Sequence, residues 1–173
     1  IADNGLMNEG IISTRLGLKG IPNFAEELQI GRDLAILEYA GGKLHFPTIS
    51  TKTSVDLIRK AKAKGLKVSC SVAAHHLFLT DDALNTFDTN YKILPPLRTS
   101  TDQKALLKGV QDGTIDFITS DHCPIDIEHK KVEFQMAQYG TIGLESFFGA
   151  INSVLKLDDF IHKAYINVAR KIY

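Results

Sequence analysis

Strand-like and helix-like segments alternate along the middle of this chain. Strand-like runs lie at residues 43–50, 66–73 and 115–119, and segments with helical spacing of apolar residues lie at 24–39, 53–64 and 101–111. Such alternation is typical of βαβ units, in which the strands form a parallel sheet. The sequence therefore predicts an α/β fold. Three strands are few for a closed barrel or a complete doubly wound sheet, so either further strands escape the pattern or the chain is part of a larger barrel.

Proline, glycine and polar residues mark where several elements begin and end. Pro22 suits the first turn of the helix over 24–39, and Gly41 and Gly42 end that helix. Thr53 opens a capping-box-like sequence and is expected to start the next helix. The remaining expectations are helices at 81–87, 143–155, 158–164 and from 167, loops at 1–21 and 126–131, and an extended segment at 90–94.

Charge and cysteine content limit the classes of function. Twenty Lys and Arg residues balance twenty Asp and Glu residues, so net charge does not favour nucleic acid or a membrane surface as a partner. No apolar run approaches the roughly 18 residues of a membrane span, and no signal peptide is visible. The two cysteines are too few for a disulfide framework, so a cytoplasmic location is expected.

Polar side chains collect where each predicted strand ends. In chain order they are Thr48, Ser50, His75, His76, Asp121, His122 and Cys123. Because the carboxyl ends of parallel strands meet at one edge of a sheet or barrel, these groups are expected to converge. Imidazole nitrogen and carboxylate oxygen are usual zinc ligands, and bound zinc activates water and polarises a carbonyl. The pattern therefore predicts a metal-dependent hydrolase in which a carboxylate transfers the proton.

Each of these residues also has a structural interpretation. His75 and His76 could form a structural or exposed pair that binds nothing. Asp121 could form a turn or cap a helix. Cys123 would then be a small buried residue, and His45, in the middle of its strand, is expected in the core.

Several motifs together resemble one enzyme family. They are Met7-Asn8-Glu9-Gly10, Arg15-Leu16-Gly17, Gly20-Ile21-Pro22, Ala25-Glu26-Glu27, Arg32-Asp33, Val72-Ala73-Ala74-His75-His76-Leu77, Tyr91-Lys92-Ile93-Leu94-Pro95-Pro96-Leu97-Arg98-Thr99, Ser120-Asp121-His122-Cys123-Pro124 and Gly143-Leu144-Glu145. In order and spacing, the set resembles dihydroorotases of the multifunctional-complex type, members of the amidohydrolase superfamily of (β/α)8 TIM-type barrels. The resemblance implies that residues 1–173 are the C-terminal portion of one barrel domain whose N-terminal portion lies outside this chain.

The resemblance also implies a reaction and a site. Dihydroorotases reversibly cyclise N-carbamoyl-L-aspartate to L-dihydroorotate in pyrimidine biosynthesis, and they use one or two zinc ions. By this resemblance Asp121 binds metal and acts as general base and acid, and His76, in preference to His75, is a second metal ligand. Ile142 and Gly143 are expected to contact the substrate ring through their backbone.

Three positions depart from the family pattern. Thr48 stands where the family has a ligand histidine, Leu94 replaces a substrate-binding asparagine, and Ile125 replaces a histidine near the substrate carboxylate. Leucine and isoleucine side chains cannot hydrogen-bond a carboxylate. The chain alone is therefore expected to be inactive, and the alternative is a non-catalytic paralogue that acts as a structural partner of aspartate carbamoyltransferase. The expected partners are a small-molecule substrate and either a second copy of the chain or that carbamoyltransferase.

Overall fold

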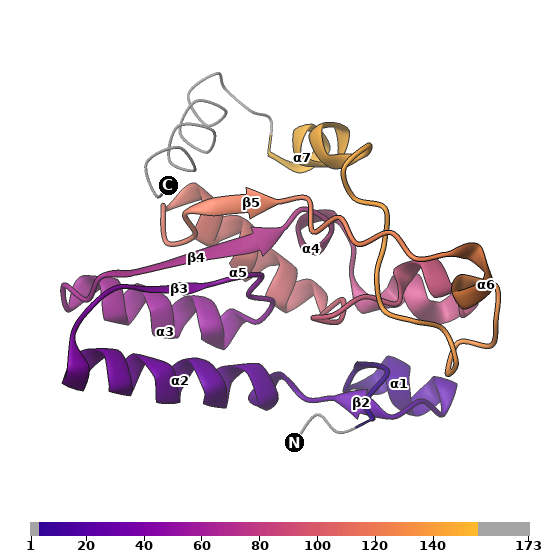
Figure 1. Ribbon diagram of the computed structural model, residues 1–173, viewed down its shortest axis with the longest axis horizontal. Helices are drawn as coiled ribbons and strands as arrows, with labels where there is room; N and C mark the ends of the chain where they lie inside the picture. The colour runs from indigo at the N-terminus through magenta and orange to yellow at the C-terminus, as the bar shows by residue number, and fades with distance from the viewer. Residues whose placement is uncertain (1–3, 156–173) are drawn as a thin grey trace.

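The computed structural model describes residues 4–155 and confirms the α/β class. Three parallel strands form the main sheet in the order β3 (Leu44–Phe46), β4 (Val68–Ala73), β5 (Phe117–Thr119), as Figure 1 shows. The register pairs Phe46 with Cys70 and Ala73 with Thr119. All three strands predicted from the sequence are present, and each is shorter than its apolar run.

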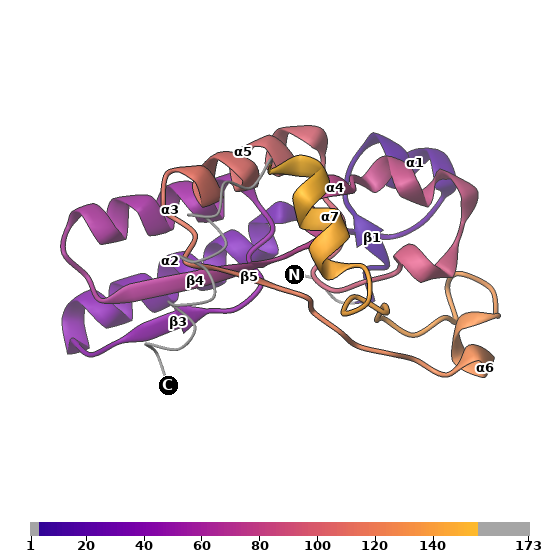
Figure 2. The same cartoon turned by 90° about the horizontal axis from the view of Figure 1, so that it is seen from above.

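Three long helices cover one face of this sheet. They are α2 (Asn23–Ala40), α3 (Lys52–Ala63) and α5 (Ser100–Gln111), and Figures 1 and 2 show them on the same side of β3, β4 and β5. Apolar side chains from all three meet the sheet in one core that includes Leu34, Ile58, Leu106 and Val72. In α3 and α5 the apolar residues with helical spacing face the buried side, which confirms the predicted periodicity. In α2 only Ile30, Leu34 and Leu37 are buried, whereas Phe24, Leu28 and Tyr39 are exposed, so the predicted stripe is confirmed only in part.

Two helix starts differ from expectation. The helix α3 begins at Lys52 with Thr51 as its N-cap, because the Thr51 hydroxyl accepts a hydrogen bond from the Ser54 N–H. Thr53, the expected start, already lies inside the helix. The helix α7 (Phe147–Val154) begins four residues later than predicted, and the N–H groups of Gly143 and Leu144 point instead to His122 Nδ1.

Short elements account for most of the errors. The expected loop at 1–21 contains a second parallel pair, β1 (Met7–Asn8) with β2 (Gly20–Ile21), and a helix α1 (Ile11–Leu16) between them. The remaining short elements are α4 (His75–Phe78), the 3-10 helices η1 (Asp81–Thr86) and η2 (Thr89–Tyr91), and α6 (Ile127–Lys130). Thus 90–94 is not extended and 126–131 is not all loop. The helices predicted at 158–164 and from 167 lie outside the described residues.

The other face of the main sheet has no helix over it in the part of the chain described. His45 projects there, exposed, with its Nδ1 2.8 Å from Ser69 Oγ and its ring 5.6 Å from that of Phe117. His45 is therefore not a core residue, because its side chain alternates to the face opposite the helices. The two outer strands, β3 and β5, leave the sheet open, so residues 4–155 do not form a closed barrel.

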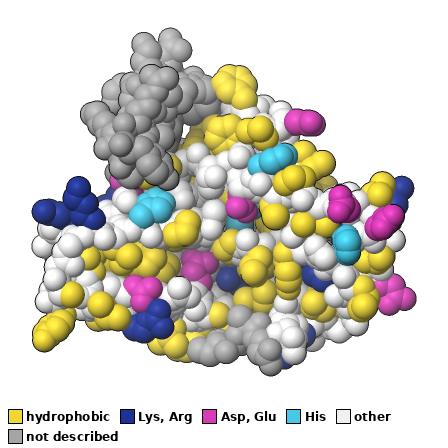
Figure 3. All heavy atoms as spheres, viewed as in Figure 1, with side chains coloured by type: hydrophobic (Ala, Val, Ile, Leu, Met, Phe, Trp, Pro, Cys, Tyr) yellow, Lys and Arg dark blue, Asp and Glu magenta, His cyan; other side chains and the backbone are white. Residues whose placement is uncertain are grey.

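Acidic and basic side chains are interspersed over the molecular face in Figure 3. Within residues 4–155, every helix is too short or too polar to cross a bilayer.

Candidate active site

Two neighbouring strand ends bring the predicted site residues together. Ala73 and Thr119 are paired at the carboxyl ends of β4 and β5, and the Ala74 N–H donates to Thr119 O at 2.8 Å. The chain leaves β4 directly into α4, which carries His75, and leaves β5 into the loop that carries Asp121. As a result His75 Nε2 lies 3.8 Å from Asp121 Oδ2.

The adjacent histidines have different surroundings. His75 is 6% exposed, and its Nε2 has no hydrogen-bond partner among the described residues. His76 is 2% exposed and its Nε2 lies 3.2 Å from Pro96 O, so this nitrogen carries the hydrogen. His76 Nδ1, also buried, is without a partner in the same part of the chain. The histidine that faces Asp121 is therefore His75, whereas His76 was the preferred ligand; the assignment of the metal ligand stays a prediction.

Burial sets the protonation of these groups. It lowers the pKa of His75 to about 4 and that of His76 to about 3, the latter with added repulsion from His75, so both imidazoles are neutral at pH 7. Burial also raises the pKa of Asp121 above its usual range. A carboxylate with a raised pKa is better suited to accept and release protons near neutral pH. His75, with its pKa lowered to about 4, stays neutral there and keeps a nitrogen lone pair that a metal ion could use.

The backbone is left-handed at two strand ends. Asp121 has φ 46° and Thr48, after β3, has φ 49°. Non-glycine residues in this region are uncommon and are concentrated at functional sites. At Asp121 the N–H donates to Thr119 Oγ1 at 3.2 Å, and the side chain stays 32% exposed.

The loop after Asp121 is fastened to the segment before α7. His122 Nδ1 lies 3.3 Å from the N–H groups of both Gly143 and Leu144, which donate to it. The Cys123 N–H donates to Thr141 O at 3.0 Å. Cys123 is exposed, so the interpretation of it as a buried residue is wrong.

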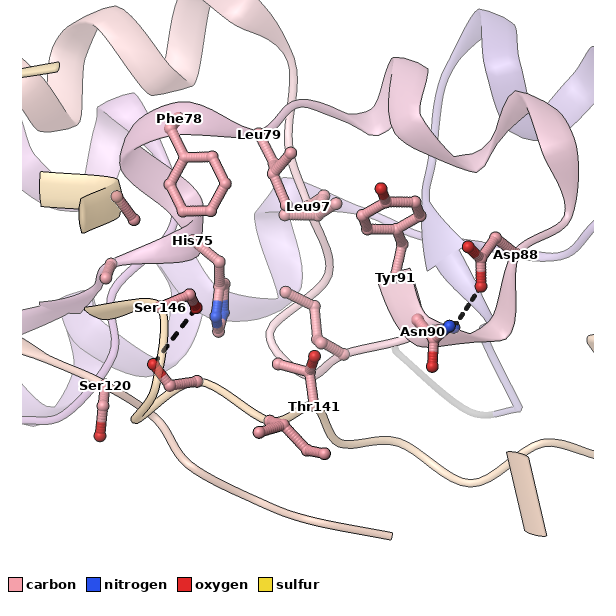
Figure 4. Close-up of a pocket in the computed structure, with 15 residues that line it drawn as sticks. His75, Phe78, Leu79, Asp88, Asn90, Tyr91, Leu97, Ser120, Thr141 and Ser146 are labelled. Carbon is pink, nitrogen blue, oxygen red and sulfur yellow. Dashed lines mark hydrogen bonds between the residues drawn. The ribbon is translucent and has the colours of Figure 1, made fainter. Parts of the chain in front are cut away.

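A pocket of about 350 Å³ lies beside these strand ends. Figure 4 shows His75 on one side of it, with Asn90 and Tyr91 across from it and Thr141 below. Ile142 and Gly143, the residues predicted to contact substrate, also line the pocket. Much of the wall is apolar; its polar members are His75, Asp88, Asn90, Tyr91, Ser120, Thr141 and Ser146.

The pocket contains residues that sequence reasoning missed. Asn90 and Tyr91 enter from η2, and Ser146 enters just before α7. None of the three lies at the end of a predicted strand, and only residues at strand ends were predicted to form the site. For Tyr91 a signal existed, because it begins one of the motifs quoted above.

The described residues provide two donors for a zinc ion and not a complete site. No group of three or more His, Cys, Asp or Glu side chains converges within residues 4–155, whereas a catalytic zinc takes three protein ligands. His45 does not serve as the third, since its Nδ1 lies 2.8 Å from Ser69 Oγ and its Nε2 3.5 Å from Ser71 Oγ. The Thr48 N–H also donates to Ser71 Oγ.

Comparison with known proteins gives consistent relatives. No family model matches the sequence. A dihydroorotase from Caldanaerobacter subterraneus is 48% identical over 155 residues, 90% of this chain and 36% of the relative. A dihydroorotase from Ruminiclostridium cellulolyticum is 43% identical over 178 residues, 99% of this chain and 42% of the relative. The chain thus spans about two fifths of these relatives or less.

Solved structures with a similar fold are hydantoinases and dihydropyrimidinases. An L-hydantoinase (dihydropyrimidinase) from Arthrobacter aurescens matches 79% of this chain and 31% of its own, with a TM-score of 0.73 and 29% identity. A dihydropyrimidinase from Brevibacillus agri matches 76% of this chain and 30% of its own, with a TM-score of 0.70 and 27% identity. The chain is therefore homologous to one part of the dihydroorotases, in the amidohydrolase superfamily.

Proposed function

We propose that this chain is part of a dihydroorotase-like cyclic amide hydrolase, which interconverts N-carbamoyl-L-aspartate and L-dihydroorotate in pyrimidine biosynthesis. The observation that carries the proposal is His75 Nε2 at 3.8 Å from Asp121 Oδ2, beside a pocket that also contains Ile142 and Gly143. The similarity to proteins named dihydroorotase supports the choice of substrate. Neighbours named hydantoinase support cyclic amides as the broader substrate class.

The proposed role of Asp121 is proton transfer. In the hydrolytic direction its carboxylate accepts a proton from the attacking water, and the resulting acid returns that proton to the departing ring nitrogen. The raised pKa of Asp121 favours this exchange, because it brings the pKa of the carboxyl group closer to neutral pH. His75 is neutral at pH 7 and stands next to the carboxylate without adding a charge that would hold Asp121 ionised.

The pocket is proposed to orient the ring. Its volume of about 350 Å³ lies at the lower end of the range for small-molecule sites, which suits a single small ring. In this proposal the backbone of Ile142 and Gly143 contacts the ring. Asn90 and Ser146 add neutral hydrogen-bonding groups to the lining of the pocket.

Zinc is the proposed cofactor, with Asp121 and one histidine of the pair as ligands. Geometry favours His75 for that histidine, because its Nε2 lies 3.8 Å from Asp121 Oδ2 and has no hydrogen-bond partner among the described residues. We further propose that residues 1–173 are the C-terminal portion of one (β/α)8 barrel domain; the open parallel sheet, with helices on one face, supports this. A cytoplasmic location agrees with two free thiols, Cys70 and Cys123.

A second candidate is a non-catalytic paralogue that binds aspartate carbamoyltransferase. The observation that favours it is at Thr48, where a threonine with a left-handed backbone replaces the expected ligand histidine. Self-association of the chain belongs to the same set of proposals.

The test uses the full-length protein that contains this chain. Metal content and cyclisation of N-carbamoyl-L-aspartate are measured for the wild type, Asp121→Asn and the control Asp126→Asn, which alters an exposed carboxylate in the following loop. We expect bound zinc, and turnover that falls at least about a hundredfold in Asp121→Asn and is retained in Asp126→Asn. Absence of zinc and turnover, together with co-elution with aspartate carbamoyltransferase, would reject the enzyme and support the paralogue.

A further inference from the structure

Two lysines are buried close to the pocket. Lys92 is 2% exposed and Lys130 is 9% exposed. A buried ammonium is costly unless it is paired or fully hydrogen-bonded. Within residues 4–155 neither lysine has a carboxylate within ion-pair distance. Each ammonium group is instead hydrogen-bonded to backbone carbonyls, which replace the water that it would contact at the surface.

Lys92, which follows η2, reaches into the segment after α6. Its Nζ donates to Phe134 O at 2.8 Å and to Gln135 O at 3.1 Å. The same ammonium lies 5.3 Å from the ring centre of Phe134 and 5.0 Å from that of Tyr139, within the range of cation–π attraction. One side chain therefore holds three residues of the 134–139 segment.

Lys130, at the end of α6, reaches in the opposite direction. Its Nζ donates to Thr89 O at 2.7 Å, to Gln138 O at 3.0 Å and to Lys92 O at 3.4 Å. The Thr89 hydroxyl returns a hydrogen bond to Lys130 O, and the Gly140 N–H donates to Lys92 O at 3.0 Å. The two lysines thus fasten the same two segments from both sides.

These segments carry facing walls of the pocket. Asn90 and Tyr91 belong to η2, between Thr89 and Lys92, while Thr141 and Ile142 directly follow Gly140. Figure 4 shows Asn90 and Tyr91 on one side and Thr141 on another. On the η2 side the bonds end at Thr89 and Lys92, next to Asn90 and Tyr91. On the other side they end at Phe134, Gln135, Gln138 and Gly140, between one and seven residues before Thr141, and together they set the spacing of the two walls.

We infer that Lys92 and Lys130 are positioning residues, which hold residues 88–92 and 130–143 at the separation that the pocket needs for its ligand. The clamp itself rests on geometry alone; only the identity of the ligand rests on the proposed function. Burial lowers the pKa of both lysines; at Lys130 repulsion from Lys92 lowers it further and attraction to Asp88 partly offsets this. Both ammonium groups are therefore stabilised by the backbone carbonyls that they contact. Methionine retains most of the apolar stem and removes every donor, which makes it the informative substitution.

The experiment uses Lys92→Met, Lys130→Met and the control Lys131→Met in the full-length protein; Lys131 is the exposed neighbour of Lys130. Hydrogen exchange is followed in peptides that cover 86–94, 126–144 and the distant helix α3. We expect about tenfold faster exchange in the first two peptides of both buried-lysine variants and no change in α3 or in Lys131→Met. Unchanged exchange, or equal loosening of α3, would overturn the clamp.

Kinetics test the link between the clamp and the ligand. With N-carbamoyl-L-aspartate we expect KM to rise about tenfold while kcat stays within about twofold, since the lysines touch neither His75 nor Asp121. Loosened segments with an unchanged KM would overturn the link to the pocket. An inactive wild type would count against the proposed function, and the exchange result would still decide the clamp.

Discussion

At the scale of single residues, the site depends on two side chains that leave adjacent strands. The pairing of Ala73 with Thr119 fixes the distance between the two strand ends. The left-handed backbone of Asp121 then turns the chain abruptly, and its carboxylate comes to lie opposite His75. Since both histidines of the pair are buried and neutral, proton uptake by them is coupled to unfolding.

Acid should therefore destabilise the metal-free protein through His75 and His76. Their pKa values in the fold, about 4 and about 3, lie below the ordinary value of 6.5. Between these limits the unfolded chain binds protons that the native chain excludes, so stability falls as pH drops from 6.5 toward 4. With a chelator present, the urea midpoint should fall from pH 7.5 to pH 4.5, and less so in a His75→Asn/His76→Asn variant. The control is His129→Asn, which alters an exposed histidine. If the urea midpoint falls equally with pH in the double variant and in this control, the explanation is wrong.

Gly143 is required by a close backbone contact. A Cβ at this position would lie 2.1 Å from Ser120 O, so any side chain must push the pocket wall away from the β5 end. Gly143→Ala should lower the free energy of unfolding by about 1–3 kcal/mol. The control is Gly149→Ala in α7, where a Cβ meets nothing within 4 Å and stability should be unchanged or slightly higher. Equal melting temperatures for the two variants would contradict this account.

At the scale of elements, the helical layer holds the strand ends in place. The helix α3 packs against α5 and against β4, and all three contribute to one apolar core, so the position of the helices is transmitted to the sheet. Gly109 lies at the contact between α3 and α5. A Cβ there would approach Val55 Cγ1 at 3.0 Å and Ile115 Cδ1 at 3.1 Å.

Gly109→Val should therefore separate these helices. Overpacking of this kind costs about 1–3 kcal/mol of unfolding free energy, measurable by chemical denaturation. Gly31→Val in α2 is the matched control, since a Cβ at Gly31 meets no atom within 4 Å. Equal losses of unfolding free energy in the two valine variants would contradict a close contact at Gly109.

At the scale of the whole molecule, Arg98 joins the small sheet to the main one. Its Nη1 donates to Asn8 Oδ1 at 2.9 Å and to Ile21 O at 2.8 Å, and its Nε donates to Ser50 Oγ at 3.0 Å. The side chain is 3% exposed, and Nη2 lies 4.0 Å from Glu26 Oε2. One guanidinium thus contacts β1, β2, the start of α2 and the loop between β3 and α3.

Arg98→Met should be among the most damaging single substitutions. It leaves the Glu26 carboxylate without its cation and the Asn8 amide oxygen without its donor, and breaking a buried charge network in this way costs about 3–5 kcal/mol. The control Arg32→Met removes an exposed arginine, 64% accessible, and should cost at most about 1 kcal/mol. A comparison of thermal melting temperatures decides between them; similar values would show that Arg98 does not join the sheets.

The sequence alone determined the helices and strands whose apolar pattern lies within a single segment of the chain. The stripes of α3 and α5, the existence of α2 and the runs of β3, β4 and β5 were predictable, because burial of one face imposes a period on the residues of a single segment. Motif order likewise indicated the dihydroorotase resemblance, and the strand ends indicated where polar groups would meet.

Tertiary structure alone decided the features that depend on distant partners. The strands β1 and β2 have two residues each, which is too short to show a sequence period. They form because the chain brings Met7 beside Gly20, where the two segments pair. That His75 and not His76 faces Asp121 follows from how α4 leaves β4, which no spacing in the sequence specifies. Non-local pairing fixes these positions, because each depends on a surface supplied by residues far away in the chain.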